Sequence, residues 1–77
     1  MNRDDELRTL LQANRIIHGA EAALMEQIAD LDKQRMGGHD TALAERGLQA
    51  FANCLSTMRE RRELIVRTIQ QIDRGLI

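Results

Sequence analysis

Three side chains in this sequence could coordinate a soft metal ion: His18, His39 and Cys54. Metal ligands on a helix usually stand four residues apart, so that both point to the same side. These three residues are spread along the chain without that spacing. We therefore predict no metal site, and we expect Cys54, beside Leu55, to be a small apolar residue that is buried or flanks the seam, rather than a reactive thiol.

Carboxylates are the second group that could do chemistry, and four of them lie in the first half of the chain: Glu21, Glu26, Asp30 and Asp32. Metal sites in the core of a helical bundle use Glu-x-x-His pairs, and this chain has none. Nor does it contain a nucleophile–base arrangement or a glycine-rich phosphate loop. We expect Glu21 to point to the edge of the seam or to pair with an arginine of another helix, and we predict a non-enzymatic protein without a cofactor.

Arginines gather in the second half of the chain, at Arg59, Arg61, Arg62 and Arg67, with Glu60 and Glu63 between them. Such interleaved charges are typical of a solvated helix face with pairs such as Glu63 and Arg67. The alternative is a small nucleic-acid-binding regulator that uses this basic cluster. The net charge of -1 and the scarcity of aromatic side chains count against that alternative.

The elements that must position these residues read as two amphipathic helices. The chain has no proline and one aromatic residue, and it is rich in helix-forming residues. Alternating spacings of three and four residues form a hydrophobic seam at Leu7, Leu10, Asn14, Ile17, Glu21, Leu24, Ile28, Leu31 and Arg35. A second seam follows at Ala44, Leu48, Phe51, Leu55, Met58, Arg62, Ile65, Ile69, Ile72 and Leu76.

A hinge at residues 36–40 separates the two helices, which we expect at about 3–35 and about 41–75 of a single domain, 1–77. Gly37 can take the left-handed conformation that ends a helix, and Gly38 then allows the chain to reverse. His39 reads as a turn residue. Asp40 is the expected N-cap of the second helix, with Thr41 as an alternative cap. Because so short a connection makes helices antiparallel neighbours, we predict an all-α, coiled-coil-like helical hairpin.

Folding the chain at this hinge pairs residues whose numbers sum to about 76, and it places Asn14 opposite Arg62. Both residues interrupt the apolar seams. We therefore predict a polar layer in the core at Asn14 and Arg62, of the kind that fixes register and oligomeric state.

Apolar residues beside the seams make both hydrophobic stripes wider than one partner helix can cover. A two-helix hairpin of this size is also too small to be stabilised by one seam. We therefore expect two hairpins to pair as a homodimeric four-helix bundle, or the exposed stripe to bind the helix of another protein. The interface candidates are Leu11, Ile16, Ala20, Ala23, Phe51, Ala52, Leu55 and Val66.

The hinge and the start of the second helix resemble a group of small bacterial two-helix proteins. The shared residues are Gly38-His39-Asp40-Thr41, then Ala44-Glu45, Leu48 and Phe51, with Met58 and Arg62 matching a later Met/Leu-x-x-x-Arg region. The similarity covers about a quarter of the chain. It implies the helical hairpin and brings no activity with it.

The chain carries no run of about 20 apolar residues and no apolar segment behind its acidic start, so we expect no membrane span and no signal peptide. Its single cysteine cannot form an internal disulfide. An unpaired thiol fits a reducing compartment, and we therefore predict a cytoplasmic protein.

Overall fold

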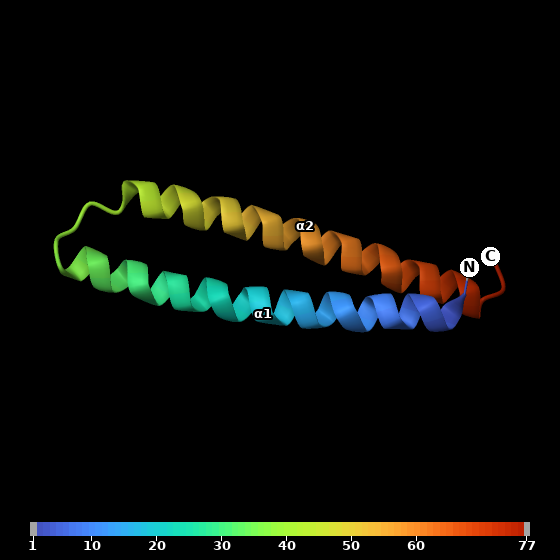
Figure 1. Cartoon of the computed structure of the whole chain (residues 1–77). Helices are drawn as coiled ribbons and strands as arrows, with labels where there is room; N and C mark the ends of the chain where they lie inside the picture. Colours follow the sequence, from blue (N-terminus) through green and yellow to red (C-terminus); the bar gives the residue numbers. More distant parts are fainter. Residues whose placement is uncertain (1, 77) are drawn as a thin grey trace.

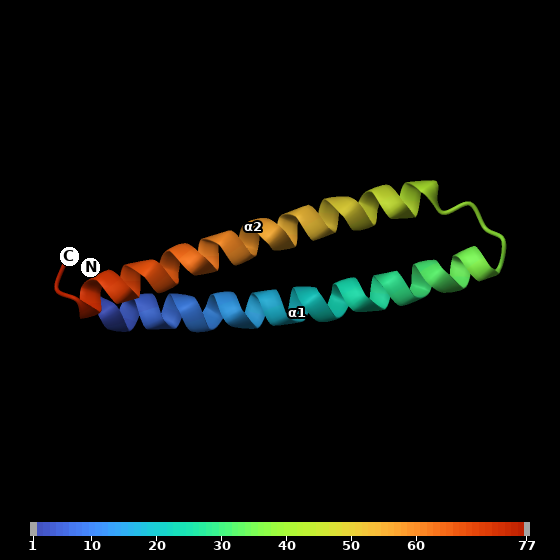
Figure 2. The ribbon, with the colours of Figure 1, turned by 180° about the vertical axis from the view of Figure 1, so that it is seen from behind.

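The computed structural model describes residues 2–76, which form two long helices, α1 (Arg3–Met36) and α2 (Ala42–Asp73). The helices run antiparallel and lie side by side, so the two ends of the chain meet at one end of the molecule (Figure 1). The view from behind shows the same single layer (Figure 2). The Cα atoms span 58 × 16 × 13 Å. The predicted all-α hairpin is confirmed.

The first helix begins where the sequence predicts. The side chain of Asn2 accepts a hydrogen bond from the backbone N–H of Asp4 at 2.9 Å, and this caps the first turn. Acidic side chains fill that turn and basic side chains occupy the last one, in the order that the helix dipole favours. Local capping and charge therefore stabilise both ends of α1.

The hinge ends α1 with two backbone hydrogen bonds that form a Schellman motif. The N–H of Gly38 donates to the carbonyl of Arg35 at 3.0 Å, and the N–H of His39 donates to that of Gln34 at 3.1 Å. Gly38 has the left-handed conformation, at φ 78°. The prediction that Gly37 would adopt it is wrong, because Gly37 keeps a helical φ of -78° and the reversal comes one residue later.

The second helix is capped from Asp40, as predicted, because its carboxylate accepts the backbone N–H of Ala42 at 3.0 Å. Thr41 occupies the N-cap position by backbone geometry, makes no side-chain cap hydrogen bond, and is buried. The ring of His39 lies so close to Gly37 that a Cβ there would come within 3.1 Å of it. All three side chains shape the turn.

The far end of α2 repeats the capping arrangement of the hinge. Gly75, at φ 75°, donates its N–H to the carbonyl of Ile72 at 3.0 Å, and Leu76 donates to Gln71 at 2.9 Å. Because Gly75 takes the left-handed conformation, α2 ends at Asp73, two residues before the predicted end.

A core one layer thick runs along the seam between the helices. Its buried hydrophobic side chains are Ile17, Leu31, Leu55 and Ile69, two from each helix. All four lie at seam positions of the predicted three-and-four spacing. This confirms the prediction of which side of each helix packs against the other helix. Most remaining seam residues are half-buried, since a single neighbouring helix cannot cover them.

The ion pairs between the helices match the predicted register at the open end and lie one helical turn away from it elsewhere. Arg3 pairs with Asp73, as the sum of 76 requires. Arg35 pairs with Glu45 rather than with a residue near 41, and Glu21 pairs with Arg59 rather than near 55. Long charged side chains reach along the helix by about one turn, so these pairs fit the same alignment of the two backbones.

Candidate interaction surface

One face of the two-helix layer is crossed by ion pairs, and we call it the ion-paired face. Glu45, Arg59 and Asp73 follow one another on α2 at intervals of fourteen residues, four turns of a coiled-coil helix, and so lie in one line. Each binds a residue of α1: Arg59 lies 3.5 Å from Glu21, Asp73 lies 2.6 Å from Arg3, and Glu45 contacts Arg35. Within residues 2–76 these are the ion pairs that join the two helices.

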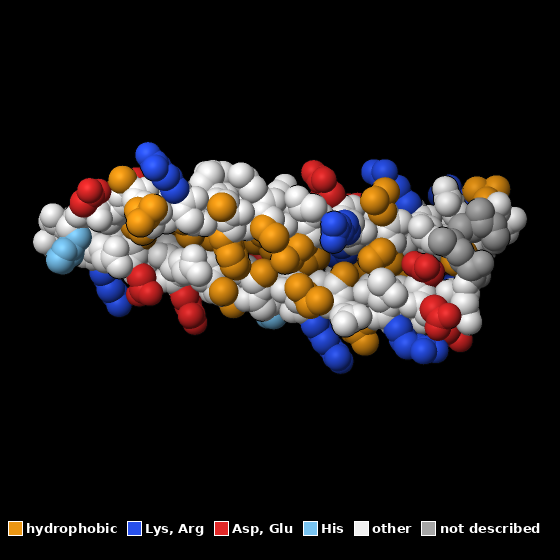
Figure 3. Space-filling view, turned by 45° about the horizontal axis from the view of Figure 1, so that its top comes forward, with side chains coloured by type: hydrophobic (Ala, Val, Ile, Leu, Met, Phe, Trp, Pro, Cys, Tyr) orange, Lys and Arg blue, Asp and Glu red, His pale blue; other side chains and the backbone are white. Residues whose placement is uncertain are grey.

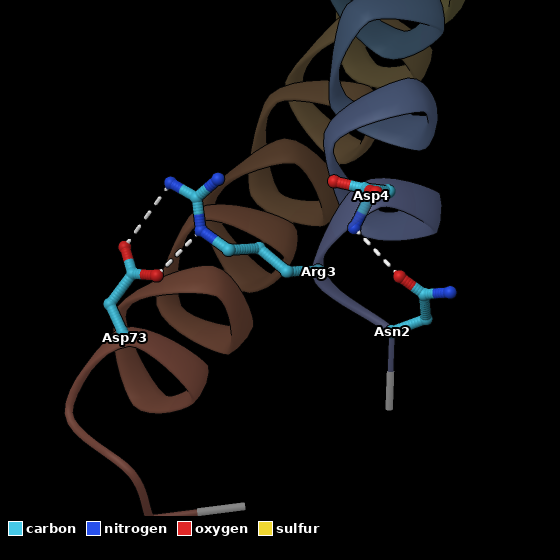
Figure 4. Close-up of polar contacts among 4 residues, drawn as sticks. All are labelled: Asn2, Arg3, Asp4 and Asp73. Carbon is cyan, nitrogen blue, oxygen red and sulfur yellow. Dashed lines mark hydrogen bonds and ion pairs between the residues drawn. The ribbon is translucent and has the colours of Figure 1, made fainter.

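The pair at the open end ties the two ends of the hairpin together (Figure 4). Figure 4 shows the Arg3 guanidinium reaching across to the Asp73 carboxylate, next to the cap that Asn2 gives α1. The hydrogen bond that the Arg3 guanidinium donates to Asp73, and then the negative charge of Asp73, raise the pKa of Arg3. Glu45 raises the pKa of Arg35 in the same way near the hinge. Both pairs are half-exposed and set alignment more than stability.

The opposite face carries two grooves between the helices, and we call it the groove face. The hinge groove has a volume of about 440 Å³ and is lined by Gln27, Asp30, Leu31, Gln34, Ala44, Gly47, Leu48 and Phe51. The central groove has a volume of about 300 Å³ and is lined by Ala13, Ile16, Ile17, Met58, Arg61 and Ile65. Figure 3 shows hydrophobic side chains gathered along the line between the helices in the middle of the molecule.

Helix periodicity places both grooves on the same face. Ile16 of the central groove and Asp30 of the hinge groove stand fourteen residues apart on α1, and Gly47 and Arg61 stand fourteen apart on α2. Residues at that interval project in the same direction. Arg59, two positions from Arg61, points to the other side of α2 and belongs to the ion-paired face.

The predicted interface residues divide between the two faces. Ile16, Ala20, Ala23 and Phe51 lie on or beside the groove face, at three-and-four spacing with the groove-lining positions. Leu11, Ala52 and Val66 lie toward the ion-paired face by the same criterion. Ile16 and Leu11 are equally accessible, with 52% and 53% of their surface exposed.

Leu55 does not belong to an outer surface. Only 1% of its surface is exposed, which makes it the most completely enclosed of the large side chains described. Its assignment to the interface is wrong, because the stripe on α2 is wide enough for the seam residue to be enclosed by α1 while its neighbours stay outside. Leu55 is a core residue of the hairpin.

The structure does not bring Asn14 and Arg62 together in a core layer. Asn14 is exposed in the single chain, and Arg62 is half-buried with its guanidinium 3.8 Å from Glu63 of the same helix. Among the residues that the structure describes, no hydrogen bond joins the two side chains. The predicted register places Asn14 and Arg62 at about the same height along the hairpin, but the two side chains do not make contact.

The arginines that cluster in the sequence do not form one surface. Arg59 binds Glu21 on the ion-paired face, while Arg61 lines the central groove on the other face. Arg62 points into the seam beside Glu63. Consecutive helix positions are turned by about 100°, so a cluster in sequence is dispersed around α2. Arg59, Arg61 and Arg62 therefore do not form one stripe along α2.

The candidate metal ligands remain apart. His39 lies at the hinge, and Cys54 is a free, exposed thiol on α2. No group of three histidine, cysteine or acidic side chains that could hold a metal ion is found in the described range 2–76. Cys54 is exposed and flanks the seam on the groove-face side of α2, which is the second of the two placements expected of it.

Comparisons with known proteins add no further identification. No family model, no curated protein and no solved structure matches the chain. The resemblance of the hinge to small bacterial two-helix proteins therefore stays a prediction. Neither helix in the described part of the chain is long and apolar enough to cross a membrane.

Proposed function

We propose that this protein is a non-enzymatic helical hairpin that pairs with a second copy into a four-helix bundle and acts through protein–protein contact. The observation that carries the proposal is the amount of surface that one hairpin leaves in water. Its accessible surface is 5951 Å². A globular monomer of this mass exposes about 4,800 Å², so the hairpin exposes about 1,200 Å² more.

The elongated shape explains that excess. The radius of gyration is 17.5 Å, whereas a compact domain of this length has about 11.5 Å. Two helices in one layer leave both faces exposed, and large apolar side chains remain accessible on them, among them Ile16, Met25 and Leu11. Packing a second layer against one face is the arrangement by which helical hairpins usually complete a core.

The size of the groove face suits such a partner. A stable protein–protein interface buries about 800 Å² on each partner. A face that spans most of the 58 Å length and the 16 Å width of the hairpin offers a surface of that order. A twofold dimer would use the groove face of both copies, so each copy would cover the exposed apolar side chains of the other.

Equilibrium unfolding in urea at several protein concentrations tests this proposal. If folding is coupled to pairing, each tenfold rise in protein concentration adds about 1.4 kcal/mol to the apparent free energy of unfolding, and the midpoint rises. If the urea midpoint does not change with protein concentration, folding is not coupled to self-association, and the proposed dimer is contradicted. The apolar face would then require a different helical protein as its partner.

We also place the protein in the cytoplasm. This part of the proposal is supported by Cys54, which is a free and accessible thiol on the surface of the hairpin. Exposed single thiols persist in reduced form in compartments kept reducing by glutathione and thioredoxin.

A further inference from the structure

The two grooves are placed symmetrically about one level of the hairpin. On α1, Ala23 lies seven residues from Ile16 of the central groove and seven from Asp30 of the hinge groove. On α2, Cys54 lies seven residues from Gly47 and seven from Arg61. Seven residues are two helical turns, about 10.5 Å. Ala23 and Cys54 therefore mark the midpoint of the groove face on both helices.

The two grooves also differ in shape in a complementary way. The hinge groove is the larger, and its α2 side is lined by Ala44 and Gly47 as well as Leu48 and Phe51; Gly47 leaves open space in place of a side chain. The central groove has a bulky rim, with Ile16 52% exposed. Two layers of helices pack well when large side chains of one layer lie opposite small side chains of the other layer.

The charges on the groove linings are complementary as well. Asp30 is the one charged residue that lines the hinge groove, and Arg61 is the one that lines the central groove. Stacking a hinge groove on a central groove brings opposite charges to the same level of the interface. Stacking like grooves on each other would bring like charges there, which costs free energy.

We infer that a second copy of this chain covers the groove face in an antiparallel arrangement, with the hinge groove of each copy over the central groove of the other. This inference rests on the proposed dimer and specifies its geometry. The twofold axis crosses the hairpin at the level of Ala23 and Cys54. In this arrangement α1 packs on α1 and α2 packs on α2, and the small side chains of Ala20 and Ala23 allow the two α1 helices to approach closely.

The geometry makes a specific demand on Cys54. At the twofold axis, the Cys54 side chains of the two copies lie next to each other, and so do the two Ala23 side chains. A disulfide requires Cα atoms within about 7 Å, which only neighbours across the axis satisfy. In a parallel arrangement α1 would lie on α2, so Cys54 of one copy would face Ala23 of the other and neither residue would meet its own equivalent.

Oxidative cross-linking with copper–phenanthroline tests this geometry on the natural chain and two single-cysteine variants. The natural chain and the Cys54→Ser/Ala23→Cys variant should each shift to a covalent dimer of twice the chain mass. The control is Cys54→Ser/Ser56→Cys, since Ser56 is exposed on the opposite side of α2 and should stay monomeric on a non-reducing gel. Circular dichroism checks that each variant keeps its helices.

The outcomes separate the geometry from the proposed function, because the mass of each protein is also measured by light scattering without oxidant. A dimeric mass with cross-links at both Cys54 and Ala23→Cys supports the antiparallel arrangement. A dimeric mass with neither cross-link, or with equal cross-linking at Ser56→Cys, overturns the arrangement and leaves the dimer standing. A monomeric mass contradicts the dimer itself, and the geometry with it.

Discussion

Replacing Ile16 with alanine should weaken self-association, whereas the same substitution at Leu11 should have little effect. The two residues make a matched pair: both lie on α1, and their exposed fractions in the single chain are 52% and 53%. Ile16 lines the central groove, while Leu11 lies toward the ion-paired face. In a lone hairpin the two substitutions would be equally mild, so only a partner on the groove face can separate them.

The expected magnitude follows from the exposed half of Ile16. Complete burial of an isoleucine side chain contributes about 1.5–3 kcal/mol, so burying the remaining half contributes about 0.8–1.5 kcal/mol per copy. A twofold dimer contains the contact twice, and its loss costs about 1.5–3 kcal/mol. The dissociation constant of the dimer should therefore rise by about 10- to 100-fold.

Sedimentation equilibrium over a range of protein concentrations measures these dissociation constants directly. Alanine is the best helix former of the twenty residues, so the helix content should not fall in either variant. The reasoning is refuted if Leu11→Ala weakens association as much as Ile16→Ala, or more, because the contact surface would then include the ion-paired face.

Further substitutions test the hairpin itself. Leu55→Ala should lower the free energy of unfolding by about 2–5 kcal/mol in a urea titration, because it leaves a cavity at the most enclosed core position; a loss below 1 kcal/mol, about the size of a surface effect, would show that Leu55 is not enclosed. Gly38→Ala should cost about 1–2 kcal/mol, since φ is 78° there, while Gly19→Ala, inside α1 with open space around it, should stabilise by about 1 kcal/mol. The opposite order of these two glycine variants would contradict the hinge geometry. Asn2→Ala should cost about 1 kcal/mol through loss of the cap, and no change in the same titration would remove the cap from the account. Titration of labelled RNA or DNA at low and high salt should show no salt-sensitive binding through Arg59–Arg67, and a steep salt dependence would restore the nucleic-acid hypothesis.

Much of the fold could be predicted because it depends on local rules. The three-and-four spacing identifies Ile17, Leu31, Leu55 and Ile69 as seam positions, and these are the hydrophobic side chains that the described part of the hairpin buries. The cap at Asn2 and the cap at Asp40 also followed from residue type alone. Hydrophobic periodicity and helix capping depend on residues that are close in the chain, so both can be predicted from a single sequence.

Details that depend on the exact backbone path could not be predicted. Gly37 and Gly38 are equally able to adopt a positive φ, and the choice of Gly38 is made by where the last turn of α1 closes. Contact between Asn14 and Arg62 requires that the two residues lie at the same height along the hairpin and that each helix is rotated about its own axis so that they face each other. The sequence supplied the alignment, but the rotation leaves Asn14 exposed.

The grooves are the feature of the candidate site that sequence reasoning missed. The width of the hydrophobic stripes predicts more than one partner helix, but it does not assign Leu11, Ile16, Ala52 and Val66 to separate faces. A signal was present in the charges, because Glu45, Arg59 and Asp73 fall in one line on α2 and mark the face that carries ion pairs. The remaining face is where the apolar grooves lie.

Size-exclusion chromatography coupled to multi-angle light scattering tests the central claim most directly, because it measures the mass of the natural chain in solution. The chain has a mass of 8.8 kDa. We predict a folded species of twice that mass at micromolar concentration, and a stable, helical species with the mass of one chain would contradict the account.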